Sequence, residues 1–198
     1  MRPAFILFCL LPFSIVGCNN GPARVAAPRL DAEEITDLAL KEFDKNSDAV
    51  IDEEELKEAP SLRYSMKALD KNENGDLERA ELLERFETYV RRKIGLRQQD
   101  VLVRRKGRPV ANATIELVPA PFMEGMIESA KGETGPTGHA MLKTVNQPIP
   151  AVRVGFYRAK VTSDNETFDA KFNTNTTLGF EIPPVTDGLG TESVIDLK

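Results

Sequence analysis

The sequence of 198 residues has few of the residues on which nucleophilic enzymes and cross-linked proteins depend: two cysteines, one histidine and no tryptophan. Both cysteines, Cys9 and Cys18, lie near the N-terminus, so neither can cross-link a folded core. His139, which follows Gly138 at a predicted strand start, is expected to be a solvated turn residue. Because this one histidine would have to serve every triad scheme, no serine or cysteine nucleophile has a plausible base. We therefore expect no enzymatic activity.

The chain also lacks an excess of positive charge and any long apolar run beyond its N-terminus. Its formal net charge is −5, with 19 of the 31 acidic residues between Asp31 and Lys93. A protein without a basic face is not expected to bind nucleic acid. No later stretch reaches the ~20 apolar residues of a spanning helix. The hydrophobic content of 41% is ordinary for one or two folded domains.

Residues 1–17 have the pattern of a signal peptide. A short basic start precedes the nearly unbroken apolar run 4–16, which is too short to span a bilayer. The run ends Ile-Val-Gly-Cys at Cys18, which resembles a bacterial lipobox. That resemblance implies cleavage after Gly17 and acylation of Cys18, and several acyl chains would anchor the protein stably. The alternative is an ordinary secretory signal, but it would leave a lone free thiol in an exported protein.

The residues after Cys18 bear on where the anchor lies. Asn19 is a residue that, in lipoproteins, does not signal retention at the inner membrane. The resemblance therefore implies an exported bacterial lipoprotein at the cell envelope, at the outer membrane or on the periplasmic side. Residues 18–29 contain two prolines, one glycine and several small residues, and they predict a flexible tether.

A twelve-residue pattern occurs twice between residues 43 and 82. The first copy, DKNSDAVIDEEE, spans 44–55, and the second, DKNENGDLERAE, spans 70–81. In each copy, oxygen-bearing side chains occupy positions 1, 3, 5, 9 and 12, an aliphatic residue occupies position 8, and apolar residues flank the twelve. Ca²⁺ takes about six to eight oxygen ligands, and this spacing supplies them in order.

The repeated pattern resembles the EF-hand, and its tandem occurrence makes the resemblance specific. The resemblance implies two Ca²⁺ sites, and Mg²⁺ is a weaker candidate because a twelve-residue loop ending in a bidentate glutamate suits the larger ion. The ligands expected in the first loop are Asp44, Asn46, Asp48, the carbonyl of Val50, Asp52 (directly or through water) and Glu55. Those expected in the second loop are Asp70, Asn72, Asn74, the carbonyl of Asp76, Glu78 and Glu81. Ile51 and Leu77, at position 8, should pair as a short antiparallel ladder.

The two loops differ at position 6, which normally requires a glycine with positive φ. Gly75 meets this requirement, whereas Ala49 would lose ~1–2 kcal/mol there, or roughly tenfold in affinity. Loop one carries more acidic positions, which offsets part of this cost. The alternative is a degenerate pair without metal, but such loops usually lose position 1 or 12, and both loops keep Asp and Glu there. We expect both loops to bind Ca²⁺, the second more securely.

Apolar residues at helical spacing predict helices on both sides of each loop. The expected segments are 30–43, 53–59, 62–69 and 79–94, with Asp31 or Thr36 as the first cap and Pro60 as a break. The last helix should carry an apolar stripe of Leu82, Leu83, Phe86, Tyr89 and Val90. We therefore predict an all-α EF-hand pair over residues 30–95.

From residue 100 the pattern changes to period two. Strands are expected at 100–105, 111–118, 139–145, 156–162, 177–182 and 193–197, which predicts a β-sandwich of about seven strands over 100–198. Residues 119–131 fit poorly and suggest a helical insertion. The segments GRPVANA (107–113), ETGPTG (133–138) and GFYRAKV (155–161) resemble a carboxypeptidase regulatory-like domain, which is a transthyretin-like sandwich.

That second resemblance implies a scaffold or adhesive module that binds a protein or a polysaccharide. Transthyretin-like hydrolases need several histidines and a C-terminal Tyr-Arg-Gly-Ser, which this chain lacks. The sequence thus predicts an α+β multidomain protein, exported and lipid-anchored, with Ca²⁺ in a mainly structural role. One alternative is a calcium-dependent sensor or accessory subunit that exposes a partner-binding groove. An enzyme of unknown class is a third, weaker option.

Overall fold

The computed structural model describes residues 25–184 and 192–198. The predicted signal peptide (1–17) and Cys18 lie outside the described residues, as does the tether before residue 25. In the part of the chain that the structure describes, no helix is long and apolar enough to cross a membrane.

The first half contains helices of unequal length and one two-stranded sheet. In order, its elements are α1 (Ala32–Phe43), β1 (Val50–Ile51), the 3₁₀ turn η1 (Glu55–Lys57), α2 (Pro60–Tyr64), α3 (Met66–Leu69), β2 (Leu77–Glu78) and α4 (Arg79–Arg92). Asp31 caps α1, since its Oδ1 accepts the N–H groups of Glu33 (3.0 Å) and Glu34 (3.2 Å). Pro60 separates η1 from α2, as expected, and it is also the first residue of α2, where its missing N–H costs nothing.

The second half is built of strands. They are β3 (Asp100–Arg105), β4 (Arg108–Pro109), β5 (Ala113–Pro119), β6 (Ala130–Glu133), β7 (His139–Met141), β8 (Lys143–Thr144), β9 (Gly155–Ser163), β10 (Gly179–Ile182) and β11 (Glu192–Leu197), with 3₁₀ turns η2 (Pro121–Met123) and η3 (Ala170–Phe172). One sheet has the order β10-β9-β5-β6-β8. In the other, β3 pairs with β4, β7 and, in parallel, β11.

The predicted fold class is wrong in three respects. The N-terminal half is not an all-α pair, because only two of its four α-helices reach seven residues and β1 and β2 form a sheet. The second half has nine described strands rather than about seven, and residues 119–131 form one 3₁₀ turn and the start of β6 rather than a helical insertion. The two halves also share one continuous hydrophobic core, so helices and sheets fold as parts of the same packing unit.

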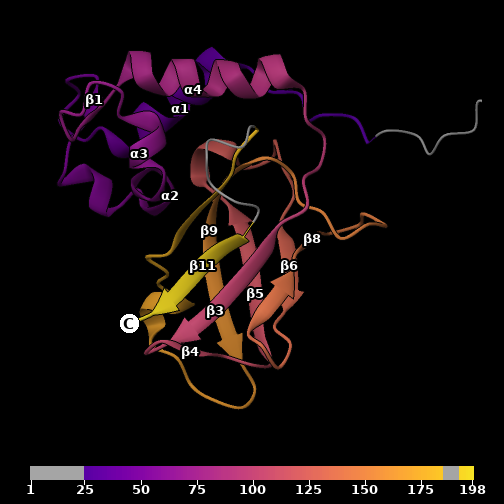
Figure 1. Ribbon diagram of the computed structural model, residues 1–198. Coiled ribbons are helices and arrows are strands. Elements are labelled where there is room, and N and C mark those ends of the chain that lie inside the picture. The colour runs from indigo at the N-terminus through magenta and orange to yellow at the C-terminus, as the bar shows by residue number, and fades with distance from the viewer. Residues whose placement is uncertain (1–24, 185–191) are drawn as a thin grey trace, which may run out of the picture.

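Aromatic residues join the helices to the five-stranded sheet. Helices α1 and α4 lie across one end of the sheets (Figure 1). The Phe86 ring of α4 contacts Phe156 of β9 edge-on, at 5.6 Å between centroids, and it lies 5.9 Å from Phe122 of η2. Phe43 of α1 meets the same Phe122 ring at 6.1 Å. Such pairs are worth about 0.5–1.5 kcal/mol each beyond the area they bury, so they stabilise the docking of the helices.

A buried ion pair connects the same two layers. Arg85 of α4 contacts Glu181 of β10 through Nε (2.9 Å) and Nη2 (2.7 Å), and their side chains are only 8% and 5% exposed. The hydroxyl of Tyr89 donates to the same carboxylate (2.6 Å). Because both charges are out of water, each depends on the other for compensation. This pair fixes α4, and with it the second loop, on the sheet.

Burial of two tyrosines predicts a loss of stability at high pH. Burial raises the pKa of Tyr89, and the charge of Glu181 raises it further; burial likewise raises the pKa of Tyr157. The unfolded chain releases these protons near pH ~10 while the folded chain retains them. Stability should therefore fall as pH rises above ~10, by ~1.4 kcal/mol per pH unit for each tyrosine. Denaturant titrations between neutral pH and pH ~11 should show a shallower fall for Tyr157→Phe; an unchanged slope would contradict this account.

Candidate functional site

The two predicted loops have the same backbone conformation. Positions 4 and 6 have positive φ in both: Ser47 (63°) and Ala49 (67°) in the first loop, Glu73 (58°) and Gly75 (91°) in the second. Ala49 therefore adopts the left-handed conformation expected from its position, although it is not a glycine. The two sequences, which differ at eight of their twelve positions, thus adopt the same backbone conformation at positions 4 and 6.

The carboxylate at position 1 holds the beginning of each loop. Asp44 Oδ1 accepts the N–H of Ser47 (2.6 Å), and its Oδ2 accepts the N–H of Ala49 (2.9 Å). In the second loop, Asp70 Oδ1 accepts the N–H of Asn74 (3.2 Å) and Oδ2 accepts the N–H of Gly75 (2.9 Å). Both aspartates face inward, into the turn that they close.

The carboxylate at position 12 folds back over each loop. Glu55 Oε1 accepts the N–H of Lys45 (2.6 Å), while Oε2 accepts the N–H of Asp52 (3.1 Å). Glu81 repeats this with the N–H groups of Lys71 (2.7 Å) and Glu78 (3.1 Å). Glu81 is also 7% exposed although it is charged. Each glutamate therefore bridges the start and the end of its loop, as a residue that closes a site must.

Hydrogen bonds also join other predicted side-chain ligands to one another. In the second loop, the amide nitrogens of Asn72 (3.0 Å) and Asn74 (3.2 Å) both donate to Glu78 Oε1. In the first loop, the Asn46 amide donates to Asp48 Oδ2 (3.0 Å), and Asp52 Oδ1 accepts the N–H of Glu55 (3.0 Å). Because Ca²⁺ accepts oxygen ligands only, the two asparagine amides of the second loop would have to rotate on binding.

The predicted ladder between the loops is confirmed. Ile51 pairs with Leu77 and Val50 with Glu78, in antiparallel register. Both position-8 side chains, Ile51 and Leu77, are fully buried. The ladder includes Val50 and adjoins Asp76, the two position-7 residues whose carbonyls are the predicted main-chain ligands. The two loops are therefore joined directly through two backbone pairs.

The donor set fits a hard cation. No group of three or more His, Cys, Asp or Glu side chains gathers as a metal cluster in residues 25–184 and 192–198. The loops instead combine carboxylates with amides and a carbonyl, which are the oxygen donors that Ca²⁺ prefers. If Ca²⁺ is bound, Asp44 and Glu55 in one loop, and Asp70 and Glu81 in the other, would hold it from opposite ends.

Exchange of the position-6 residues should change calcium affinity in opposite directions. Ala49→Gly removes the cost of the left-handed alanine and is expected to tighten the first loop roughly tenfold. Gly75→Ala should weaken the second loop by a similar factor, although open space around Gly75 leaves room for the methyl group. Calorimetric titration of both variants measures this. Equal affinities for parent and variants would show that neither backbone position limits binding.

The histidine lies in a different part of the molecule. His139 begins β7, and its Nδ1 lies 3.0 Å from Asp100 Oδ2 on the neighbouring β3. His139 therefore stands at a strand start as predicted, and its side chain is 40% exposed, but it belongs to the strand rather than to the turn and is paired with a carboxylate. Ser193, the nearest serine of the adjoining β11, accepts a hydrogen bond from Gln99 (3.1 Å), which gives it a structural partner of its own.

Sequence reasoning missed the Arg85–Glu181 pair that holds α4 in place. Arg85 lies on the buried side of α4, beside Phe86 and Tyr89, and Glu181 lies between Phe180 and Ile182 in β10. The only signal in the sequence is a charged residue within an otherwise apolar stretch. No local sequence pattern connects Arg85 with Glu181, because 96 positions separate them.

Comparison of the chain with known protein families, with curated proteins and with solved structures found no match.

Proposed function

We propose that this protein binds two Ca²⁺ ions in the paired loops 44–55 and 70–81. The observation that carries the proposal is the repeated hydrogen-bond pattern, in which the carboxylates at positions 1 and 12 turn inward in both loops. The same loops combine oxygen donors with positive φ at position 6. Affinities in the range of extracellular calcium modules, ~10⁻⁴–10⁻³ M, would suit an exported protein.

The packing of the helices favours a structural role for calcium over a sensor role. A sensor exposes an apolar groove when calcium opens its helices. Here Leu62, Leu82 and Phe86 are fully buried against the rest of the core. Opening the helices would also separate Arg85 from Glu181, leaving two uncompensated buried charges. We therefore propose that calcium stabilises a helical layer that is already docked on the sheet.

Thermal unfolding separates the two roles. If calcium is structural, millimolar Ca²⁺ should raise the melting temperature, because it binds the folded chain and not the unfolded one. Binding of a hydrophobic dye should stay unchanged. A calcium-induced increase in dye fluorescence would favour the sensor role. An unchanged melting temperature together with no heat of binding would contradict calcium binding itself. Mg²⁺ at the same concentration is the matched control.

We further propose that the protein is exported and held at the bacterial envelope by acylation of Cys18, and that it is not an enzyme. The lipobox pattern before Cys18 supports the anchor. The sheet that contains β3, β7 and β11 supports a binding or adhesive role, because Met141 (47%) and Val194 (41%) are exposed on it. Mass spectrometry of the mature protein tests the anchor: the account expects a chain that starts at an acylated Cys18.

A further inference from the structure

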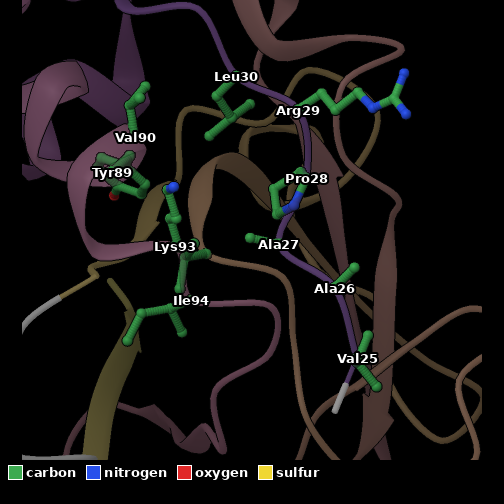
Figure 2. A pocket seen from close by; sticks show the side chains of 11 residues that line it. Val25, Ala26, Ala27, Pro28, Arg29, Leu30, Tyr89, Val90, Lys93 and Ile94 are labelled. Atoms are coloured by element: carbon green, nitrogen blue, oxygen red, sulfur yellow. The ribbon is translucent and has the colours of Figure 1, made fainter. Parts of the chain in front are cut away.

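Three segments that are distant in the sequence meet at one end of the molecule. They are residues 25–30, the C-terminal end of α4, and the loop that follows β8. Residues 25–30 line a groove of about 590 Å³ together with Tyr89, Val90, Lys93 and Ile94 of α4 and the turn after it (Figure 2). Arg153, just beyond the loop, donates from Nη1 to the carbonyls of Ala26 (2.6 Å) and Gly95 (3.1 Å). Figure 1 shows residues 25–30 beside the C-terminal end of α4, with the loop after β8 projecting on the same side of the molecule.

Residues 25–29, the described part of the tether, pack closely against the segment that follows α4. A Cβ at Gly95 would lie 2.1 Å from the carbonyl oxygen of Val25, so the glycine permits an approach that any other residue would prevent. The position of Val25 on the molecule is therefore well defined. Val25 lies seven positions after Cys18, and seven residues span at most ~25 Å. A lipid on Cys18 would therefore hold this end of the molecule within that distance of a bilayer.

Exposed cations and exposed large apolar side chains occur at this end of the molecule and on the loop after β8. We call this surface the tether face and define it by Arg29, Val90, Arg92, Lys93, Val145 and Ile149. Val90 (37%), Val145 (43%) and Ile149 (48%) are three of the six exposed large apolar residues in the described chain. Arg29, Arg92 and Lys93 are also exposed, and Figure 2 shows the Arg29 side chain directed away from the groove.

The tether face stands out against the charge of the rest of the chain. The protein as a whole carries a net charge of −5. The nearby Glu128 is already paired with Arg153, at 2.9 Å. Surfaces that rest on anionic bilayers combine exposed cations, which meet the headgroups, with exposed apolar side chains, which enter the interface. A soluble acidic partner would account for the cations but not for Val145 and Ile149 on a projecting loop.

We propose that the tether face binds the surface of an anionic phospholipid bilayer. The inference deepens the proposed function, since it rests on an exported, anchored protein for its setting. It does not require acylation of Cys18 or occupied calcium loops. Arg92 and Lys93 attract the headgroups, Ile149 and Val145 enter the interface, and the tether leaves the molecule on the bilayer side. The helical layer and the sheets then take one fixed orientation to the membrane.

Vesicle sedimentation tests the proposal on residues 19–198. This chain lacks Cys18 but retains the whole described core, whose first residue is Ile35. The probes are vesicles of phosphatidylcholine alone and of equimolar phosphatidylcholine and phosphatidylglycerol. We expect binding to the mixed vesicles only, and weaker binding at high salt. The double variant Arg92→Gln, Lys93→Gln should bind roughly 30-fold more weakly, since each cation near such a surface contributes ~1 kcal/mol. Ile149→Ser should also weaken binding.

The matched control removes two cations from the opposite end of the molecule, in the turn between β3 and β4. Lys106 and Arg108 are both exposed, and Lys106 (φ 51°) has the same left-handed backbone as Lys93 (φ 50°). Lys106→Gln, Arg108→Gln should bind within about twofold of the parent. Equal losses in the two double variants, or equal binding to both kinds of vesicle, would overturn the proposal. Binding should persist in EDTA, so a failure of the calcium proposal remains distinguishable.

Discussion

Replacement of Glu181 by alanine is expected to lower the free energy of unfolding by about 3–5 kcal/mol. The change leaves the guanidinium of Arg85 buried without its carboxylate, and it removes the acceptor of the Tyr89 hydroxyl. Chemical denaturation measures the loss. Glu133→Ala, which removes an exposed carboxylate from β6 of the same sheet, should change stability by less than ~0.5 kcal/mol.

A double variant distinguishes loss of compensation from loss of packing. Arg85→Met combined with Glu181→Leu removes both charges and keeps apolar volume, so it should recover most of the stability lost in Glu181→Ala. A loss below ~1 kcal/mol for Glu181→Ala alone would mean that the pair does not hold α4 on the sheet. The second loop would then lack the support that the structure gives it.

Replacement of Glu81 by glutamine is expected to weaken calcium binding in the second loop by more than the ~10–100-fold that loss of an outer-shell partner costs at a metal site. The side chain keeps its shape, but only one of its two oxygens remains, and it no longer carries the charge that a bidentate ligand supplies. Calorimetric titration should then report one site where the parent has two. Glu84→Gln is the matched control, because it lies one turn further along α4 and is exposed.

The same titration can also contradict the assignment of Glu81 as a calcium ligand. If Glu81→Gln and the parent bind calcium equally, the carboxylate is not a ligand and its three backbone hydrogen bonds are its whole role. If both variants lose binding equally, the effect arises from the charge of the helix and not from the loop. Only a loss confined to Glu81→Gln supports the site.

The candidate site was predictable because its determinants are local. All ligands of a loop lie within twelve residues, and the aliphatic position 8 that joins the loops is part of the same pattern. The sequence therefore predicted the Ile51–Leu77 pair, the inward acids at positions 1 and 12, and the left-handed position 6. Most strands of the second half were predicted for a similar reason, since alternation over five to nine residues depends on one buried face.

The predicted fold class was wrong because the surface on which α4 packs is formed by residues that are distant from it in the sequence. The helical pattern predicted Leu83 and Val90 within the buried stripe of α4, whereas Arg85 and Glu81 are buried and Val90 is exposed. The stripe is rotated because α4 packs against α1 on one side and against the sheet on the other. Arg85 tolerates that burial only because Glu181 comes from a distant part of the chain, and no periodicity in the helix indicates that partner.

Calcium counting by native mass spectrometry tests the central claim most directly. We predict that the protein, titrated with Ca²⁺ to a few millimolar, gains two ions, and that Glu81→Gln gains one under the same conditions. A parent protein that binds no calcium, or that binds it no better than the double variant Asp44→Ala, Asp70→Ala, would contradict the account of the two loops.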